Sequence, residues 1–200
     1  KSKRPKTIDK VVDAIFQIQG GYALVMLTQN SLIGVRDPYG IRPLVIGKLG
    51  KSYVLASETC ALDIIGAKFV RDVENGEIVL IEKDELTSIK PFPPKKIRPC
   101  VFEYIYFARP DSIIDNKTAY EHRKSIGVEL AKENDVDADI VVPVPDSGNA
   151  AALGYSQHLK MNYEHGLIRN HYVGRTFIEP SQKIRSLGVK LKLNANQTTI

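Results

Sequence analysis

The start of the chain has hydrophobic residues at helical spacing, preceded by Thr7 and followed by Gly20-Gly21. Its apolar positions are Ile8, Val11, Val12, Ile15 and Ile18. This spacing predicts an amphipathic helix that Thr7 caps and the glycine pair ends. Short apolar runs bounded by turn residues come next, and they predict strands of an antiparallel sheet, interrupted by a short helix at 60–65. The expected strands are 22–27, 31–35, 44–46, 53–56 and 77–81.

A segment rich in proline and basic residues, 90–99, separates this pattern from a different one. It carries four prolines and four Lys or Arg residues, and little that would form a core. We therefore expect a domain boundary here, with one domain in 1–92 and a second in 93–200. The elements expected after it are a strand at 101–107, a helix at 118–134, a buried parallel-type strand at 140–144 and a helix at 149–159. This alternation of strands and helices indicates an α/β domain.

Composition narrows the class of protein. The chain has 200 residues, of which 43% are hydrophobic and 26% charged, as in ordinary globular domains. No apolar run approaches the ~20 residues that a membrane helix needs, so no membrane partner is expected. The two cysteines, Cys60 and Cys100, are too few for a disulfide framework and belong to no Cys-x-x-Cys pair. We therefore expect a reducing, cytoplasmic setting.

The net charge of +5 lies in one segment, 169–196, which holds six Lys or Arg residues and a single Glu. Glycines and aromatic residues interrupt this segment, and it shows no clean period of 2 or 3.6 residues. Its composition leaves three interpretations open. They are a mobile cationic lid over an anionic ligand, a nucleic-acid contact through Arg beside aromatic rings, and a solvated basic loop with no ligand.

Two further stretches carry candidate chemistry. The loop of Asp146, Ser147 and Gly148 joins an apolar strand to a helix, which fits either a phosphate site at a helix N-terminus or a simple helix cap. Upstream, Tyr104 and Tyr106 lie two residues apart in an expected strand and would face the same side of it. Taken alone, packing of that strand is the simpler explanation for the two tyrosines.

Six strings of the sequence, taken together in chain order, are more specific than any single string. Together they resemble the glutamine phosphoribosylpyrophosphate amidotransferase family, through RDPYGIRPL (36–44), LASE (55–58), FEYIYFARPDS (102–112), VPDS (144–147), YVGRTFI (172–178) and KLNAN (192–196). The resemblance runs nearly end to end. It implies a chain of α/β and α+β class: the C-terminal part of an Ntn-hydrolase αββα sandwich, followed by the N-terminal part of a type I phosphoribosyltransferase α/β domain with its flexible loop.

The same resemblance implies an activity in de novo purine biosynthesis. Members of the family are glycosyltransferases with glutamine amidotransferase activity, and they transfer glutamine-derived ammonia to phosphoribosylpyrophosphate. The products are 5-phosphoribosylamine, glutamate and pyrophosphate. The implied partners are phosphoribosylpyrophosphate, glutamine and inhibitory purine nucleotides, with Mg²⁺ as cofactor. A homo-oligomer is also expected, and no nucleic acid.

Site residues carry over from the family one by one. Asp146, Ser147 and Gly148 match the loop that binds pyrophosphate, with Ser147 as a Mg²⁺ contact and Gly148 where relatives have Ser. Arg169 and Lys192 match cations that bind phosphoribosylpyrophosphate. Residues that match the flexible loop or the ammonia channel are Tyr106, Tyr172, Gly174, Arg175 and Ile178. Cys100 matches a 4Fe–4S ligand of cluster-bearing members, but cluster-free members also carry Cys there, so both alternatives stay open.

Two parts of the family pattern are absent from the printed sequence: the N-terminal cysteine nucleophile and the acidic phosphoribosyl-binding loop. No catalytic residue for glutamine hydrolysis is therefore identified, and we expect no turnover from these 200 residues alone. Two alternatives to an enzyme remain open at this point. One is a non-catalytic nucleotide- or anion-binding module, and the other is a nucleic-acid binder that uses 169–196.

Overall fold

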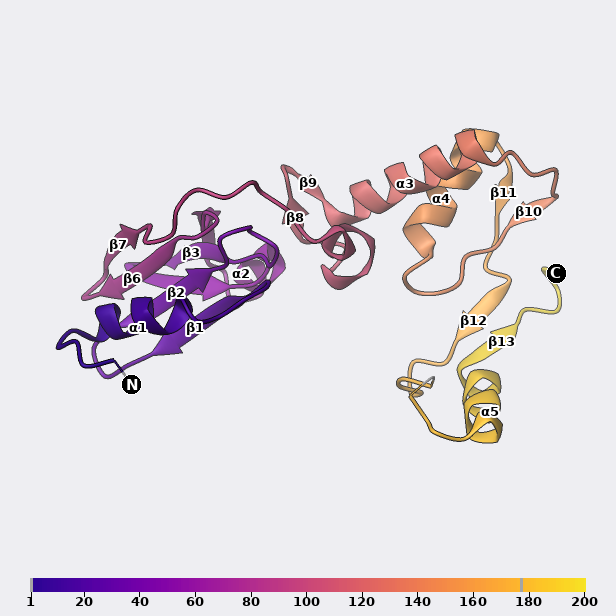
Figure 1. Ribbon diagram of the computed structural model, residues 1–200. Helices are drawn as coiled ribbons and strands as arrows, with labels where there is room; N and C mark the ends of the chain where they lie inside the picture. Colours follow the sequence, from indigo (N-terminus) through magenta and orange to yellow (C-terminus); the bar gives the residue numbers. More distant parts are fainter. Residues whose placement is uncertain (1, 177) are drawn as a thin grey trace. The chain divides into compact units, whose positions relative to one another are not determined.

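The computed structural model describes residues 2–176 and 178–200. It divides into two compact units, the first ending at Asn116 and the second running from Lys117 to Ile200. Figure 1 shows their elements in chain order. Antiparallel sheets in the first unit and mixed helices and strands in the second confirm the expected fold class. The units divide later than residue 92, where the domain boundary was expected, because residues 98–113 attach to the first unit; the boundary itself stays a prediction.

The first unit contains a four-stranded and a three-stranded sheet, both antiparallel. The four-stranded sheet has the order β1-β2-β6-β7, and its strands are β1 (Ala23–Leu27), β2 (Leu32–Arg36), β6 (Ile78–Glu82) and β7 (Glu85–Ile89). The three-stranded sheet has the order β4-β3-β5, with β3 (Val45–Leu49), β4 (Ser52–Ala56) and β5 (Lys68–Asp72). The sequence did not predict β5 and β7, because both alternate weakly and are rich in polar residues.

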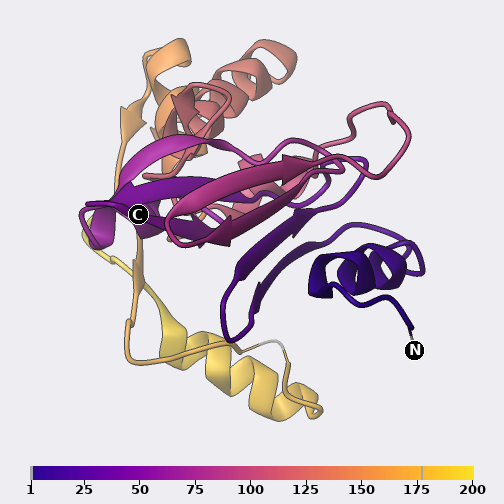
Figure 2. The same ribbon diagram turned by 90° about the vertical axis from the view of Figure 1, so that its left-hand side faces the viewer.

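The helices α1 (Thr7–Ile15) and α2 (Thr59–Ile64) cover the outer faces of these sheets. One core lies between α1 and the four-stranded sheet and contains Ile15, Ile33 and Ile78. A second contains Ile46 and Val79, one from each sheet, and so lies between the sheets. A third core packs α2 on the three-stranded sheet. The order is therefore helix, sheet, sheet, helix, which confirms the αββα expectation; Figure 2 shows α1 beside its sheet from a second side.

Alternation along the strands explains why four layers form. On β6, Ile78 faces α1 and its neighbour Val79 faces the other sheet. On β2, Ile33 faces α1, whereas a Cβ at Gly34 would lie 2.7 Å from Leu55 Cδ1 of β4. Because successive strand residues point to opposite faces, a sheet that is apolar on both faces must be covered on both. The continuous apolar runs in this part of the sequence therefore produce buried sheets.

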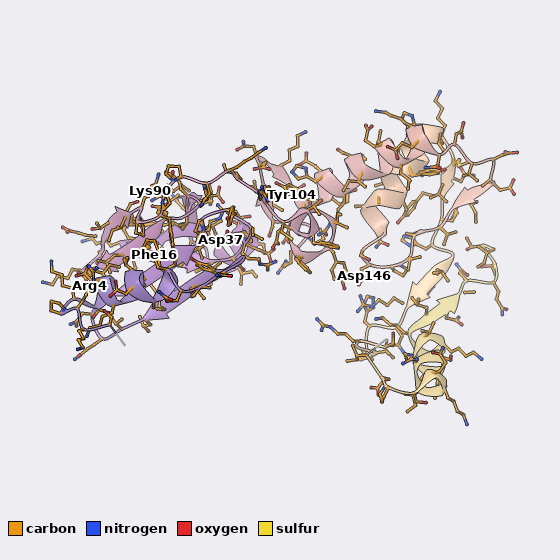
Figure 3. All side chains as sticks on the ribbon, viewed as in Figure 1. Arg4, Phe16, Asp37, Lys90, Tyr104 and Asp146 are labelled. Carbon is orange, nitrogen blue, oxygen red and sulfur yellow. The ribbon has the colours of Figure 1, made fainter. Side chains whose placement is uncertain are left out.

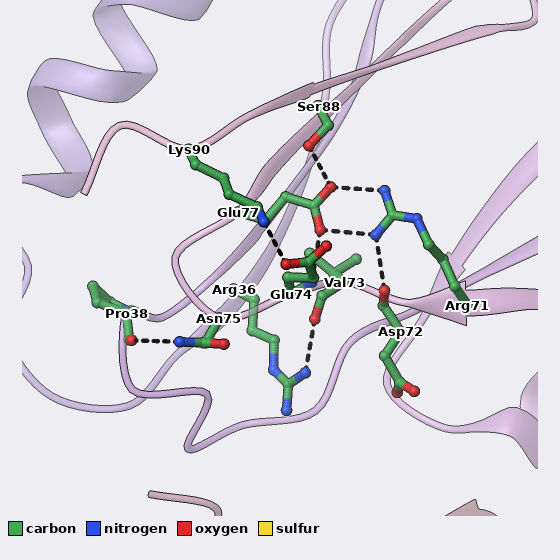
Figure 4. A network of polar contacts seen from close by, with 10 residues as sticks. All are labelled: Arg36, Pro38, Arg71, Asp72, Val73, Glu74, Asn75, Glu77, Ser88 and Lys90. Atoms are coloured by element: carbon green, nitrogen blue, oxygen red, sulfur yellow. Dashed lines mark hydrogen bonds and ion pairs between the residues drawn. The ribbon is translucent and has the colours of Figure 1, made fainter. Parts of the chain in front are cut away.

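A buried carboxylate joins the two sheets through a polar network (Figure 4). Glu77 accepts hydrogen bonds from Arg71 Nη1 (2.8 Å) and Nη2 (2.7 Å), from Ser88 Oγ (2.6 Å) and from the Glu74 amide (2.6 Å). Desolvation of the buried side chain acts to raise the pKa of Glu77, but these hydrogen bonds outweigh it and leave the pKa below its ordinary value. Arg71 lies on β5, and Ser88 on β7. The network thus fixes one sheet against the other.

Residues 101–107 form a helical turn, and the expectation of a strand there is wrong. The turn ends in a π-helical segment, η1 (Glu103–Phe107), in which the Ala108 amide donates to Glu103 O. Tyr104 and Tyr106 consequently do not share one face of a strand, as was expected. Apolar runs of this length fit a strand or a helix equally well by periodicity, which is why the pattern misled. The first unit ends with β8 (Ile113–Ile114).

The second unit begins with β9 (Lys117–Thr118) and α3 (Ala119–Glu133), and Thr118 and Glu121 form a capping box at the start of the helix. A parallel pair follows, β10 (Ile140–Val141) with β11 (Asn162–Tyr163), joined through α4 (Asn149–Leu159). The two helices pack at backbone distance, since a Cβ at Gly127 would lie 1.8 Å from Ala151 O. The expected buried strand at 140–144 is shorter than predicted, and Val144 is exposed.

The basic segment 169–196 is more regular than its composition suggested. It runs from β12 (Leu167–Arg169) through α5 (Gln182–Lys192) into β13 (Leu193–Ala195), and β12 pairs with β13 antiparallel. Ile184, Leu187 and Leu191 give α5 a helical spacing that the interruption by Gly188 obscured. The expectation of a wholly aperiodic loop is therefore wrong for 182–195.

Candidate functional site

The loop of Asp146, Ser147 and Gly148 lies between β10 and α4. Backbone hydrogen bonds close it, from Gly148 N to Val144 O (3.0 Å) and from Asn149 N to Asp146 O (3.3 Å). Gly148 occupies the N-cap position of α4, and no side chain caps the helix there. Neither Asp146 nor Ser147 is thus placed as the helix cap, and both lie just before a helix N-terminus, where anions are favoured.

Glycine at position 148 has a steric reason. A Cβ on this residue would lie 2.7 Å from the carbonyl oxygen of Val144, which is closer than a Cβ carbon approaches a backbone oxygen. Its φ is −80°, so the requirement comes from this close approach and not from a left-handed backbone. The tight turn therefore presents backbone and the Ser147 side chain, with no side chain at 148 between them.

An ion pair connects this loop to the basic segment. The guanidinium of Arg169, on β12, pairs with the Asp146 carboxylate, and Figure 3 shows Asp146 on the loop before α4. The Arg169 side chain is only 28% exposed. Its Nε is buried without a hydrogen-bond partner among the described residues. Arg169 therefore keeps donor capacity beside a helix N-terminus.

Lys192 is brought next to Arg169 by the β12–β13 pairing. Its carbonyl oxygen accepts a hydrogen bond from the Asn170 amide (2.8 Å), and the following residue, Leu193, is the register partner of Arg169. Residues 23 positions apart in the sequence thus have neighbouring backbones, and Asp146 joins them through its ion pair. Two of the predicted binding residues, Asp146 and Arg169, are thus in contact, and the backbone of the third, Lys192, lies beside that of Asn170.

The loop between β12 and α5 holds further predicted residues. Tyr172 is completely exposed, and Gly174, Arg175 and Ile178 are exposed as well. Thr176 is the exception, because it is buried against Gly188 of α5, where a Cβ would lie 3.3 Å from Thr176 Cγ2. Nothing in the sequence singles out this contact, since neither residue is charged. In the described part of this loop, the buried Thr176 therefore lies between the exposed residues Arg175 and Ile178.

In the first unit, Tyr106 is 63% exposed on η1, whereas Glu103 of the same turn is buried. Glu103 forms an ion pair with Arg42 (Nη1–Oε1, 2.6 Å). Burial raises the pKa of Glu103 above its ordinary value, and the nearby Arg42 opposes this shift without cancelling it. Burial and the hydrogen bond to Asp115 raise the pKa of Tyr104 to about 12. The predicted shared role of Tyr106 and Ile178 in a channel stays a prediction, because they belong to separate units.

Metal-ligating residues are sparse. Cys60 is a buried free thiol and Cys100 a half-buried one. Within residues 2–176 and 178–200, no group of three or more His, Cys, Asp or Glu side chains is suited to hold a metal ion. A 4Fe–4S cluster takes four thiolates, and the two cysteines of this chain do not supply them. Cys100 as a cluster ligand therefore stays a prediction.

Comparisons with known proteins show which family this chain resembles. A family model described as a glutamine amidotransferase domain matches residues 5–63. The amidophosphoribosyltransferase of Rhizobium etli is 56% identical over 100% of this chain, and that of Synechocystis is 52% identical over 94% of it. The chain belongs to the amidophosphoribosyltransferase family. It spans 41% and 38% of the length of these two relatives.

Solved structures of amidophosphoribosyltransferases have the same fold. The glutamine phosphoribosylpyrophosphate amidotransferase of B. subtilis, complexed with ADP and GMP, matches with a TM-score of 0.91 and 43% identity. The match covers 100% of this chain and 44% of that one. Some amidophosphoribosyltransferases are chloroplastic, such as that of Glycine max. Among the described residues of this chain, no helix is both long and apolar enough to cross a membrane.

Proposed function

We propose that the protein carrying this chain transfers glutamine-derived ammonia to phosphoribosylpyrophosphate, giving 5-phosphoribosylamine, glutamate and pyrophosphate. The contact that carries the proposal is the Asp146–Arg169 ion pair, which joins the loop before α4 to the basic segment. The pairing of β12 with β13 also brings the backbone of Lys192 beside that of Asn170, the residue after Arg169. An anionic substrate with three phosphate positions needs such a combination of helix N-terminus and cations.

The residues of the second unit supply binding and charge stabilisation. Pyrophosphate leaves the ribose as a highly charged anion, and cations placed around it lower the free energy of that step. Arg169 has an unpaired buried Nε to offer, and Lys192 is a second cation. The exposed loop around Tyr172 and Arg175 is placed to cover a bound ligand and to keep water from competing with ammonia.

The loop chemistry also fits Mg²⁺. This ion prefers oxygen ligands and is commonly held by one or two protein groups together with substrate phosphates. Asp146 and Ser147 offer a carboxylate and a hydroxyl. When bound with substrate, Mg²⁺ would neutralise phosphate charge. The carboxylate of Asp146 would then exchange its partner Arg169 for the ion and free the guanidinium for phosphate.

The test is equilibrium binding of phosphoribosylpyrophosphate with Mg²⁺, measured by calorimetry, to the protein that carries this chain. Lys192→Ala removes one charge-assisted contact, and we expect affinity to fall about 10- to 100-fold. Lys183→Ala is the matched control, since Lys183 lies exposed on the same helix. In the complete enzyme, Lys192→Ala should slow the ammonia-dependent reaction and spare glutamine hydrolysis. Equal affinities for the two variants would contradict the assignment.

Purine nucleotides are the second candidate ligand of this site. A B. subtilis relative is described as complexed with ADP and GMP, which supports inhibition by purine nucleotides in this protein. Nucleotides that compete with phosphoribosylpyrophosphate in the same titration would establish it. Binding of arbitrary DNA or RNA that weakens steeply with salt, with no effect of phosphoribosylpyrophosphate, would instead favour a nucleic-acid contact through 169–196. A homo-oligomeric state and a cytoplasmic location stay predictions.

A further inference from the structure

Residues 98–113 form the stretch through which the chain leaves the first unit, and polar contacts hold both ends of this stretch. At its start, Arg98 N donates to Tyr39 O (2.8 Å) and Cys100 N donates to Ile41 O (3.2 Å). Glu103 then pairs with Arg42. The beginning of the stretch is therefore attached to the turn that follows β2.

The other end is attached to the start of α2, mainly through one carboxylate. Glu58 Oε2 accepts hydrogen bonds from the Arg109 amide (2.7 Å) and from Ser112 Oγ (2.7 Å). Next to it, Thr59 Oγ1 accepts from the Ile113 amide (2.8 Å). Ser112 is 1% exposed, so its hydroxyl has little water to replace Glu58. Glu58, just before α2, and Thr59, its first residue, thus hold a segment more than fifty positions away.

Packing supplies little of this attachment. A cavity of about 430 Å³ lies between the stretch and the sheets, lined on one side by Cys100, Ala108 and Ser112 and on the other by Pro43 and Val45. In the helical turn of this stretch, Val101, Phe102 and Phe107 are each at least half exposed. Since the stretch buries few apolar side chains, hydrogen bonds decide where it lies.

We propose that Glu58 is a positioning residue that fixes the exit of the chain from the first unit, and that it thereby sets how completely glutamine hydrolysis is coupled to ammonia transfer. The coupling part rests on the proposed function. The chain order makes residues 98–113 the covalent connection from the amidotransferase-type sheets to the second unit. If the connection moves, the two activities continue separately, but the released ammonia is lost to water.

The first test measures position without catalysis. Hydrogen exchange is compared in the complete enzyme that carries this chain, as wild type and as Glu58→Ala, Glu58→Gln and Asp111→Asn. We expect the amides of 108–114 to exchange about tenfold faster in Glu58→Ala and less so in Glu58→Gln, which keeps one acceptor oxygen. Asp111→Asn is the matched control, because its exposed ion pair with Arg109 lies on the same loop and it should leave exchange unchanged. Unaltered exchange in β3 and β4 would show that the fold is intact.

The second test measures the coupling in the same proteins. The glutamate formed per phosphoribosylamine should rise at least about twofold in Glu58→Ala, while the rate with ammonia as nitrogen donor stays within about twofold of wild type. A general folding defect would lower both rates together and leave their ratio unchanged. Glu58→Gln should give an intermediate ratio, and Asp111→Asn the wild-type ratio.

Three results would overturn the inference or part of it. Unchanged exchange at 108–114 in Glu58→Ala would refute the positioning role itself. Faster exchange with an unchanged product ratio would refute the coupling role. If the wild-type protein makes no phosphoribosylamine from either nitrogen source, the proposed function fails and the coupling with it, whereas the exchange test still decides whether Glu58 holds the segment.

Discussion

Replacing Glu77 by Gln should loosen the contact between the two sheets of the first unit. The carboxylate is 1% exposed and accepts four hydrogen bonds, two of them from the Arg71 guanidinium. An amide offers one acceptor oxygen and points an NH₂ group at donors, so Arg71 keeps a charge without its partner. Breaking a buried pair costs about 3–5 kcal/mol, and because Arg71 is partly exposed we expect about 3 kcal/mol.

Native-state hydrogen exchange of the β6 amides is a suitable assay, since it reports on this unit alone. A loss of about 3 kcal/mol corresponds to exchange roughly 100-fold faster, at 1.4 kcal/mol per factor of ten. Glu74→Gln is the matched control, because it makes the same chemical change in an exposed ion pair with Lys90. Acceleration below about fivefold, or equal effects of the two variants, would refute the argument that the buried network stabilises the sheets.

The pH dependence gives a second check on Glu77. The pKa of Glu77 in the folded protein is lower than in the unfolded chain, where the pKa of glutamate is about 4.3. The contribution of Glu77 to the free energy of unfolding is therefore complete above the unfolded-state pKa and is lost as the pH falls through the folded pKa. The difference in the free energy of unfolding between wild type and Glu77→Gln should accordingly shrink as the pH falls below about 4.3. A difference that stays constant with falling pH would contradict the pKa direction.

Two further substitutions follow from close contacts. Gly127→Ala would place a Cβ 1.8 Å from Ala151 O and should destabilise the second unit by about 1–3 kcal/mol or more, whereas Gly174→Ala, with open space around it, should change the unfolding midpoint little. Equal midpoints would disprove the helix contact. Asp37→Asn should speed amide exchange at 39–42 about tenfold, because the buried carboxylate accepts four backbone N–H bonds and an amide cannot accept them all. Unchanged exchange there would remove Asp37 as the organiser of that turn.

Local patterns predicted most elements of this chain. The helices at 7–15, 119–133 and 149–159 lie close to where the sequence pattern placed them. The prediction that Thr7 caps the first helix is wrong, because the N-cap is Lys6 and the helix ends at Ile15, before Gly20-Gly21. Sequence patterns predicted the wrong element where tertiary contacts override the local conformational preference of the residues. Residues 101–107 form a helical turn, and the residues on either side of it bond to Tyr39, Ile41 and Glu58, contacts that are not visible in the apolar run itself.

The candidate site divides in the same way. Asp146, Arg169 and Lys192 were identified from sequence strings, but the Asp146–Arg169 ion pair and the pairing of β12 with β13 were not. The sequence shows Glu58 only as part of the LASE string and does not mark Thr176 as a functional residue. A lone carboxylate or a lone threonine gives no signal in a sequence when its spatial partners are unknown. Gly148 stood out only as a departure from relatives, and the Val144 carbonyl supplies its reason.

The sequence alone determined the class of each unit, the position of most elements, and the concentration of charge in 169–196. These follow from short-range chemistry: periodicity, capping and composition. The tertiary structure alone decided that the basic segment is an antiparallel pair carrying a helix, that Arg169 meets Asp146, and that residues 98–113 lie on the first unit. The physical reason is that each of these contacts joins residues far apart in the chain, and their cost in chain entropy is met only when the whole fold forms.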